Sequence, residues 1–154
     1  MESLETGIDF ENSIGPWLGR TVKTIDFYFQ EVLKEHGFDL TKEQMVVLKK
    51  LHDKDGINQN ELAFLTLRNK SSLTRLLSKM EKRTYITRLA CKEDKRVKQV
   101  YLTAFGRDIF LKVKPIIRAT ISIMEEHVSA DEKQQVIAVL RKIQTNLGAT
   151  AEHI

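Results

Sequence analysis

The chain has 154 residues, of which 42% are hydrophobic and 30% are charged. This length and composition predict one folded domain, residues 1–154, and exclude a chain that is disordered throughout. With only 7 glycines and 2 prolines, long helices are favoured over a loop-rich β architecture. The longest apolar run, residues 136–140, is far shorter than the roughly 20 residues that a membrane-spanning helix needs. We therefore expect a mainly helical protein without a membrane partner.

The N-terminal residues and the cysteine content both predict a cytoplasmic location. Glu2, Glu5, Asp9 and Glu11 precede any apolar stripe, whereas a signal peptide begins with a basic and then an apolar segment. Cys91 is the single cysteine, so no intrachain disulfide can form.

The formal net charge of +4 is distributed unevenly along the chain. Residues 57–103 hold 11 Lys and Arg against 4 Asp and Glu, whereas residues 1–56 carry a net charge of −4 and residues 104–154 one of +1. A basic block between acidic and near-neutral segments is typical of a protein that binds a polyanion. A solvated lysine-rich surface is the alternative that composition alone leaves open.

Apolar residues at spacings of three and four predict a long N-terminal helix that starts at about Pro16 and ends at Gly37. Later helices are expected to start at residues whose side chains can accept a hydrogen bond from the first turn. Thr41, Asn58 and Ser129 are each followed three residues later by Gln or Glu, which predicts a capping box. These three residues, together with Asn69 and Thr103, mark the expected helix starts.

Residues 86–91 and 97–103 differ from the helical segments, because they are short and rich in β-branched and aromatic residues. They predict a hairpin whose charged loop is longer than two residues. Residues 41–103 thus follow the order helix, short helix, helix, hairpin, which is that of a winged helix-turn-helix. The expected fold is mainly α with a small β-hairpin, in which residues 1–38 and 104–148 form helical dimerisation regions and residues 149–154 a tail.

The third helix of this unit, at about residues 69–83, has two faces of different chemistry. Leu73, Leu76, Leu77 and Met80 form an apolar stripe that is expected to face the core. Hydroxyl groups on the opposite face can bond phosphates or bases, and an arginine can bind guanine through two hydrogen bonds. This helix is expected to enter the major groove of DNA. The DNA-binding side chains expected on it are Lys70, Ser71, Ser72, Thr74, Arg75, Ser78 and Lys79.

The predicted wing, at about residues 86–103, carries Lys92, Lys95 and Arg96 around Glu93 and Asp94. A minor groove narrowed by A·T sequence attracts a guanidinium group. We expect Lys92 and Lys95 to contact DNA, Arg96 to enter the minor groove, and the Asp94 carboxylate to order the turn.

Two segments resemble the MarR family of bacterial transcription regulators. Residues 94–103, DKRVKQVYLT, are similar to its D-x-R-x-x-x-V-x-L-T wing signature, and residues 73–83, LTRLLSKMEKR, are similar to its recognition helix. The resemblance extends through the order of elements from Phe10 to Gly148. It implies a winged helix-turn-helix in each protomer of a homodimer, and often a small-molecule pocket. The sequence departs from the family at Thr84-Tyr85, where members commonly have glycine and then an aliphatic residue.

The apolar stripes of the terminal helices predict the dimer independently, because they form more apolar surface than one small winged helix can cover. Packing back onto the same protomer is the alternative. A two-fold protein implies a pseudo-palindromic operator, whose half-sites lie about 34 Å apart. The residues expected at the dimer interface are Phe10, Ile14, Trp17, Leu140, Ile143 and Leu147.

Other kinds of site are not indicated. The histidines do not follow metal-ligand spacing, and no nucleophile or nucleotide motif occurs, so we expect no metal, no cofactor and no enzyme activity. Cys91, beside Lys92, is either a half-buried strand residue or a redox-sensing thiol. The leading hypothesis is a dimeric, sequence-specific DNA-binding repressor released by a small ligand. A winged-helix module that binds an acidic protein and a non-specific DNA-binding protein are the alternatives.

Overall fold

The computed structural model describes residues 7–148, which pack as two compact units that divide after Leu40. The first unit consists of α1 (Ile14–Glu35) and the segments flanking it. Pro16 lies in the first turn of α1, where its missing N–H has no helical partner to lose. The helix ends before Gly37, whose φ is +79°, as predicted. The expected tail at 149–154 lies outside the described residues.

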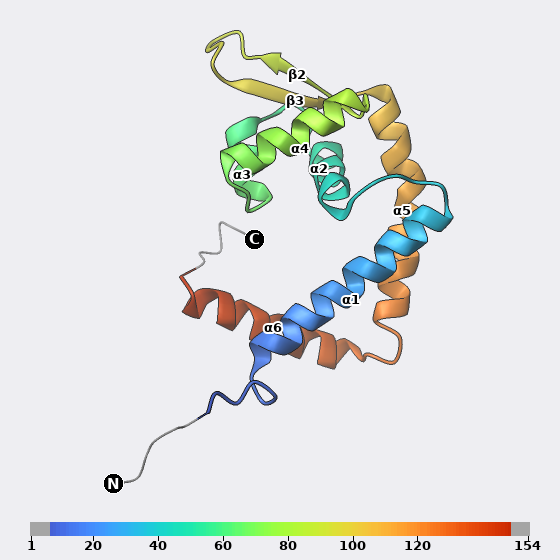
Figure 1. The fold of residues 1–154 in the computed structure, drawn as a ribbon, viewed down its shortest axis with the longest axis vertical. Helices are drawn as coiled ribbons and strands as arrows, with labels where there is room; N and C mark the ends of the chain where they lie inside the picture. Colours follow the sequence, from blue (N-terminus) through green and yellow to red (C-terminus); the bar gives the residue numbers. More distant parts are fainter. Residues whose placement is uncertain (1–6, 149–154) are drawn as a thin grey trace. The chain divides into compact units, whose positions relative to one another are not determined.

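The second unit contains the predicted winged helix-turn-helix and the two C-terminal helices (Figure 1). Its elements are α2 (Lys42–Asp53), β1 (Ile57–Asn58), α3 (Gln59–Leu65), α4 (Lys70–Lys82), β2 (Ile86–Ala90), β3 (Lys98–Leu102), α5 (Ala104–Met124) and α6 (Ala130–Asn146). The mainly helical fold with a hairpin is thereby confirmed. The hairpin loop spans residues 91–97, longer than two residues as predicted.

The sheet has three strands, although only two were predicted. Its order is β1-β3-β2, and both pairs are antiparallel. Ile57 of β1 pairs with Val100 of β3. Gly56 allows this pairing, because its φ is +72° and a Cβ at this position would lie 2.8 Å from a Tyr101 ring carbon. A two-residue strand is too short to show an alternating pattern in the sequence.

All five predicted helix caps are present, but one of the three predicted capping boxes is incomplete. Thr41 with Gln44 and Ser129 with Glu132 form complete capping boxes. Asn58 accepts a hydrogen bond from the Glu61 backbone at 2.8 Å, but the Glu61 carboxylate bonds Lys54 at 3.2 Å and does not return to the cap. The predicted box at Asn58 is therefore wrong in its second half, because a nearby ammonium group competes for the carboxylate.

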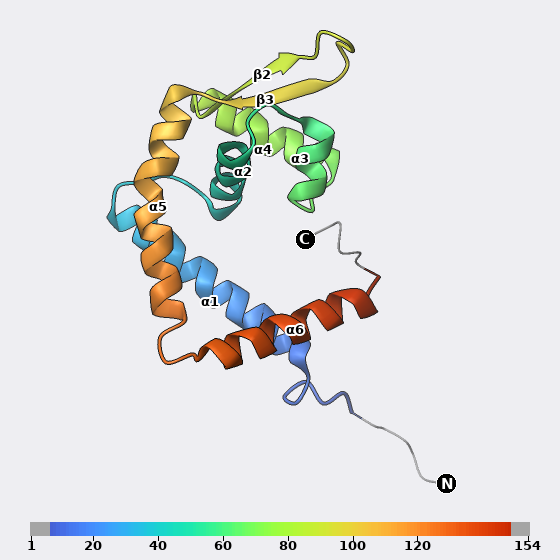
Figure 2. The same cartoon turned by 180° about the vertical axis from the view of Figure 1, so that it is seen from behind.

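The core of the second unit lies between its first three helices, the sheet and α5. The apolar stripe of α4 is sealed in it, apart from Leu76, which is half-buried. The opposite face of α4 is consequently left at the surface. Figure 2, which shows the other side, again places the β2–β3 hairpin beside α4. The fully buried residues include Val47, Leu48, Leu51, Ile57, Leu62, Leu73, Leu77, Met80, Ile86, Val100, Phe110 and Val113.

The turn between α4 and β2 forms even though it lacks the family's glycine. Thr84 adopts a left-handed conformation with a φ of +62°. The Thr103 hydroxyl donates to the backbone oxygen of Thr84 at 2.5 Å and lies 3.1 Å from that of Tyr85. Gly106 allows α5 to approach this turn, since a Cβ there would lie 2.0 Å from the Tyr85 oxygen. Packing against α5 thus holds a turn that the motif did not predict.

Between residues 7 and 148, no helix is both long enough and apolar enough to cross a bilayer. The same residues contain no cluster of three or more His, Cys, Asp and Glu side chains that could hold a metal ion.

Candidate nucleic-acid interface

The exposed face of α4 carries cations that can bind an anion, among them Lys70, Arg75 and Lys79. Asn69 caps the helix by accepting from the Ser72 backbone at 2.8 Å, so the helix starts where it was predicted. Lys70, Arg75 and Lys79 are exposed, and their side-chain nitrogens form no hydrogen bond or ion pair with the described part of the chain. Their positive charge is therefore available to phosphate groups.

The hydroxyl groups predicted to contact DNA have partners within the protein. Ser71 donates to Asn69 at 3.0 Å, and Thr74 donates to the Lys70 backbone oxygen at 2.8 Å. Ser72 accepts from Arg68 Nη1 at 2.8 Å. These hydroxyl groups bond residues 68–70 at the start of α4. Sequence periodicity alone does not show these contacts.

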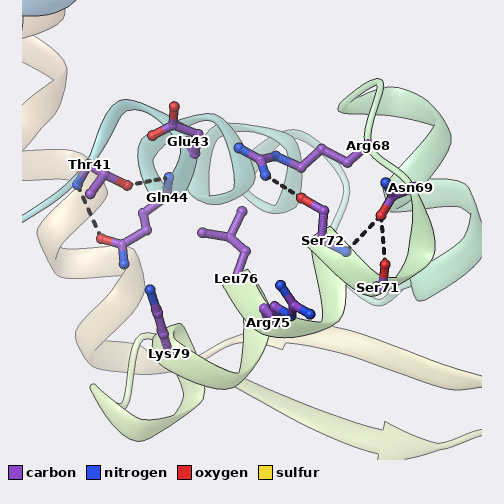
Figure 3. Close-up of a pocket in the computed structure, with 10 residues that line it drawn as sticks. All are labelled: Thr41, Glu43, Gln44, Arg68, Asn69, Ser71, Ser72, Arg75, Leu76 and Lys79. Atoms are coloured by element: carbon purple, nitrogen blue, oxygen red, sulfur yellow. Dashed lines mark hydrogen bonds between the residues drawn. The ribbon is translucent and has the colours of Figure 1, made fainter.

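A hollow of about 400 Å³ lies on one side of α4 (Figure 3). The N-terminal turn of α2 forms its other wall, where the Thr41–Gln44 capping box is visible. Arg68, Arg75 and Lys79 line this hollow, against one acidic side chain, Glu43. Arg68 was not predicted as a site residue, because it precedes the helix and its spacing carries no signal.

A second hollow, of about 450 Å³, lies between α3, α4 and the wing. Four cationic side chains line it: Lys70 of α4, and Arg88, Arg96 and Lys98 of the hairpin. Gln59 of α3 also lines it and donates to Thr74 at 3.2 Å. Arg88, Lys98 and Gln59 were not predicted as site residues. Arg88 and Lys98 belong to the basic block, but the sequence does not show which strand positions face α4, because this depends on how the hairpin packs.

The loop of the wing has the ordered turn that the sequence suggested. Asp94 Oδ1 accepts from the Arg96 backbone N–H at 3.0 Å and from Arg96 Nε at 3.3 Å. The Arg96 side chain is nevertheless 92% exposed. Lys92 and Lys95 are exposed in the same loop, and Cys91 is half-buried at its start. The contacts between this loop and DNA stay a prediction.

An ion pair joins the end of α4 to the hairpin, and we call it the Glu81–Arg88 clamp. Glu81 Oε1 accepts from Arg88 Nη2 at 3.1 Å, and Glu81 Oε2 accepts from the Arg88 backbone N–H at 3.0 Å. Ser78, predicted as a DNA contact, accepts from the same Nη2 at 3.3 Å. Hydrogen bonding to Arg88 lowers the pKa of Glu81 below its ordinary value, so the carboxylate is charged at neutral pH.

The residues predicted for a dimer interface remain largely open in the protomer. Phe10, Ile14 and Trp17 belong to the first unit and are at least half exposed. In the second unit, Leu140 and Ile143 of α6 are half-buried, and Leu147, which follows α6, is 83% exposed.

Comparison with known proteins identifies the family that this arrangement belongs to. The profile of the MarR family matches residues 40–98. The transcriptional regulator HosA of Escherichia coli O157:H7 is 33% identical over 105 residues, which cover 68% of this chain and 78% of HosA. The chain is a member of the MarR family.

Solved structures agree with this assignment. The Staphylococcus aureus MepR–DNA complex is 26% identical, with a TM-score of 0.78, and the match covers 85% of this chain and 96% of MepR. Bordetella bronchiseptica BpsR, whose DNA binding is regulated by 6-hydroxynicotinic acid, has the same fold at 20% identity, with a TM-score of 0.81 and coverage of 90% and 97%. This MarR-family protein is thus a winged-helix transcriptional regulator. Because its relatives are regulators, the prediction that it is not an enzyme is confirmed.

Proposed function

We propose that this MarR-family regulator binds a pseudo-palindromic operator as a homodimer, with α4 in the major groove and the hairpin loop at the minor groove. The observation that carries the proposal is the pair of cationic hollows on either side of α4. A helix lying in the major groove has a phosphate backbone on each side of it. Cations on both flanks therefore fit double-stranded DNA better than they fit a single acidic segment of a protein.

The proposed dimer is supported by the terminal helices. Trp17 of α1 is 56% exposed, and Val136 of α6 is 55% exposed. Apolar surface of this kind is stabilised when a second copy covers it. Two copies would present two α4 helices, which a two-fold operator requires.

We further propose that DNA binding represses transcription and is released by a small-molecule effector. The support is at the level of the family, since DNA binding by BpsR, which shares the fold, is regulated by a small aromatic acid.

The proposal is tested by selecting bound duplexes from a random pool and footprinting the selected site at several salt concentrations. We expect a two-fold sequence, with protection of two major grooves about one helical turn apart. The logarithm of affinity should fall linearly with the logarithm of salt concentration, by about 0.9 for each phosphate contact. A salt slope without sequence preference would indicate a non-specific DNA-binding protein. No binding to duplex DNA would favour a module that recognises an acidic protein.

A further inference from the structure

The clamp fastens an edge strand to the recognition helix. β2 lies at one edge of the sheet, so alternate N–H groups of this strand have no neighbouring strand to bond. Glu81 accepts one of these N–H groups, that of Arg88, and the Arg88 guanidinium returns to the same carboxylate. The base of the wing is thereby bonded to the last turn of α4 through both backbone and side chain.

Arg88 is poorly placed to act mainly as a phosphate contact, although it lines the second hollow. Its side chain is only 12% exposed, and its Nη2 is shared between Glu81 and Ser78. Arg96 in the same hollow is 92% exposed. The two arginines of the wing therefore differ: Arg88 is largely buried with its Nη2 bonded to two side chains, whereas Arg96, although its Nε donates to Asp94, is exposed to solvent.

We infer that Glu81 and Arg88 are positioning residues that set the orientation of the wing relative to α4. When α4 lies in the major groove, this orientation brings Arg96 to the adjacent minor groove. This inference rests on the proposed function. A duplex fixes the distance and angle between neighbouring grooves, so two reading elements must be held in one relative orientation to bind together. Neither Glu81 nor Arg88 needs to contact DNA for this role.

The sign of the effect of Glu81→Gln separates the inference from simple electrostatics. Removing an acid near a polyanion site should tighten binding if charge alone matters. If the clamp positions the wing, Glu81→Gln should instead weaken binding to the selected duplex by roughly three- to thirty-fold, the range of indirect coupling effects in proteins. Arg88→Lys, which keeps the charge but cannot hold both carboxylate oxygens, should weaken binding in the same range. Glu93→Gln, with the same charge change in the exposed loop, is the matched control and should bind as tightly as wild type or tighter.

A second readout distinguishes positioning from a general loss of stability. Each protein is titrated against the selected duplex and against one whose minor-groove flanks are changed from A·T to G·C, and its thermal unfolding is recorded. Wild type should prefer the A·T flanks, and Glu81→Gln should lose this preference while remaining folded at the assay temperature. Adding Arg96→Ala to Glu81→Gln should cause little further loss, because both changes remove the same contact.

Tighter binding by Glu81→Gln, or full additivity with Arg96→Ala, would overturn the inference while leaving the proposed function intact. If wild type shows no sequence preference, the proposed function fails first, and the inference fails with it.

Discussion

The winged helix-turn-helix, residues 41–103, and the terminal helix α6 differ in how far their apolar side chains are buried. In α4, Leu73, Leu77 and Met80 are at most 1% exposed. In α6, which the structure describes completely, no residue is buried, although Val136, Val139 and Leu140 follow the same helical spacing. The amphipathic pattern in the two helices is similar, but only the apolar stripe of α4 is buried within its own unit.

The side chains left exposed on each helix indicate the kind of partner that the helix can bind. α4 seals its apolar side and leaves cations exposed, so its free face suits a polyanion. α6 leaves apolar side chains exposed, and Phe27 of α1 is 72% exposed, so these helices suit an apolar partner such as a second copy.

The largest effect should come from placing a charge on the apolar face of α6. We expect Leu140→Asp to convert the proposed dimer to a monomer, because a carboxylate at a packed interface is left without a partner. Losing the second half-site contact should lower operator affinity by about 100-fold or more. Sedimentation measures the assembly, and a gel-shift titration measures the affinity.

Gln134→Asp, on an exposed polar position of the same helix, is the control and should leave both measurements unchanged. If Leu140→Asp remained dimeric with full affinity, this face of α6 would not form the interface.

The next effect should separate a base contact from a phosphate contact among the exposed cations of α4. If Arg75 reads a base, Arg75→Ala should cost about 1–3 kcal/mol on the selected operator and much less on random DNA. Lys79→Ala is the matched comparison, and as a phosphate contact it should weaken both duplexes alike and reduce the salt slope by about one. Equal losses on both duplexes for Arg75→Ala would make it a phosphate contact too.

The sequence predicted those helices and strands in which apolar residues recur several times at a regular spacing. The bounds of α4, its cap at Asn69 and the division of its two faces were all predictable, because four apolar residues recur at helical spacing. β1 was not predictable, since two residues carry no period. The Asn58 capping box failed because Lys54, four residues upstream, attracts the Glu61 carboxylate.

The candidate site was predictable in its charges but not in its internal contacts. All the cations that line the two hollows belong to the basic block of residues 57–103. The Asp94–Arg96 contact was expected from their spacing of two residues. The Glu81–Arg88 clamp was not expected, since its partners belong to a helix and a strand whose packing the sequence does not show. The same holds for Ser78, which was predicted as a DNA contact and is bonded to Arg88.

A smaller effect should follow from changes in the wing loop. Asp94→Ala removes the carboxylate that holds the backbone and side chain of Arg96. We expect it to weaken operator binding by about 1 kcal/mol, the typical contribution of one hydrogen bond, even though the protein becomes more positive. Arg96→Ala should weaken binding most on duplexes with A·T flanks. Titrating both variants at two salt concentrations tests this, and a tighter Asp94→Ala complex would contradict the ordering role of Asp94.

The smallest effect concerns stability alone, at the turn where α4 passes into the wing. Thr84 has a φ of +62°, a conformation that is costly for a β-branched residue and free of strain for glycine. Its backbone oxygen, which accepts from Thr103, would be retained in a glycine variant. We expect Thr84→Gly to raise the free energy of unfolding by about 0.5–1 kcal/mol, since the relieved strain exceeds the entropy that glycine loses on folding.

Thermal unfolding monitored by circular dichroism measures this gain, and the affinity for the operator should stay the same. Thr87→Gly is the matched control, because Thr87 pairs with Tyr101 in the extended strand β2, where glycine gains nothing and weakens the sheet. The two identical substitutions should therefore change stability in opposite directions. If Thr84→Gly were as destabilising as Thr87→Gly, the prediction would be wrong. The hydroxyl and methyl groups of Thr84 would then stabilise the turn by more than its backbone conformation costs, and the family's glycine would not be the better residue in this chain.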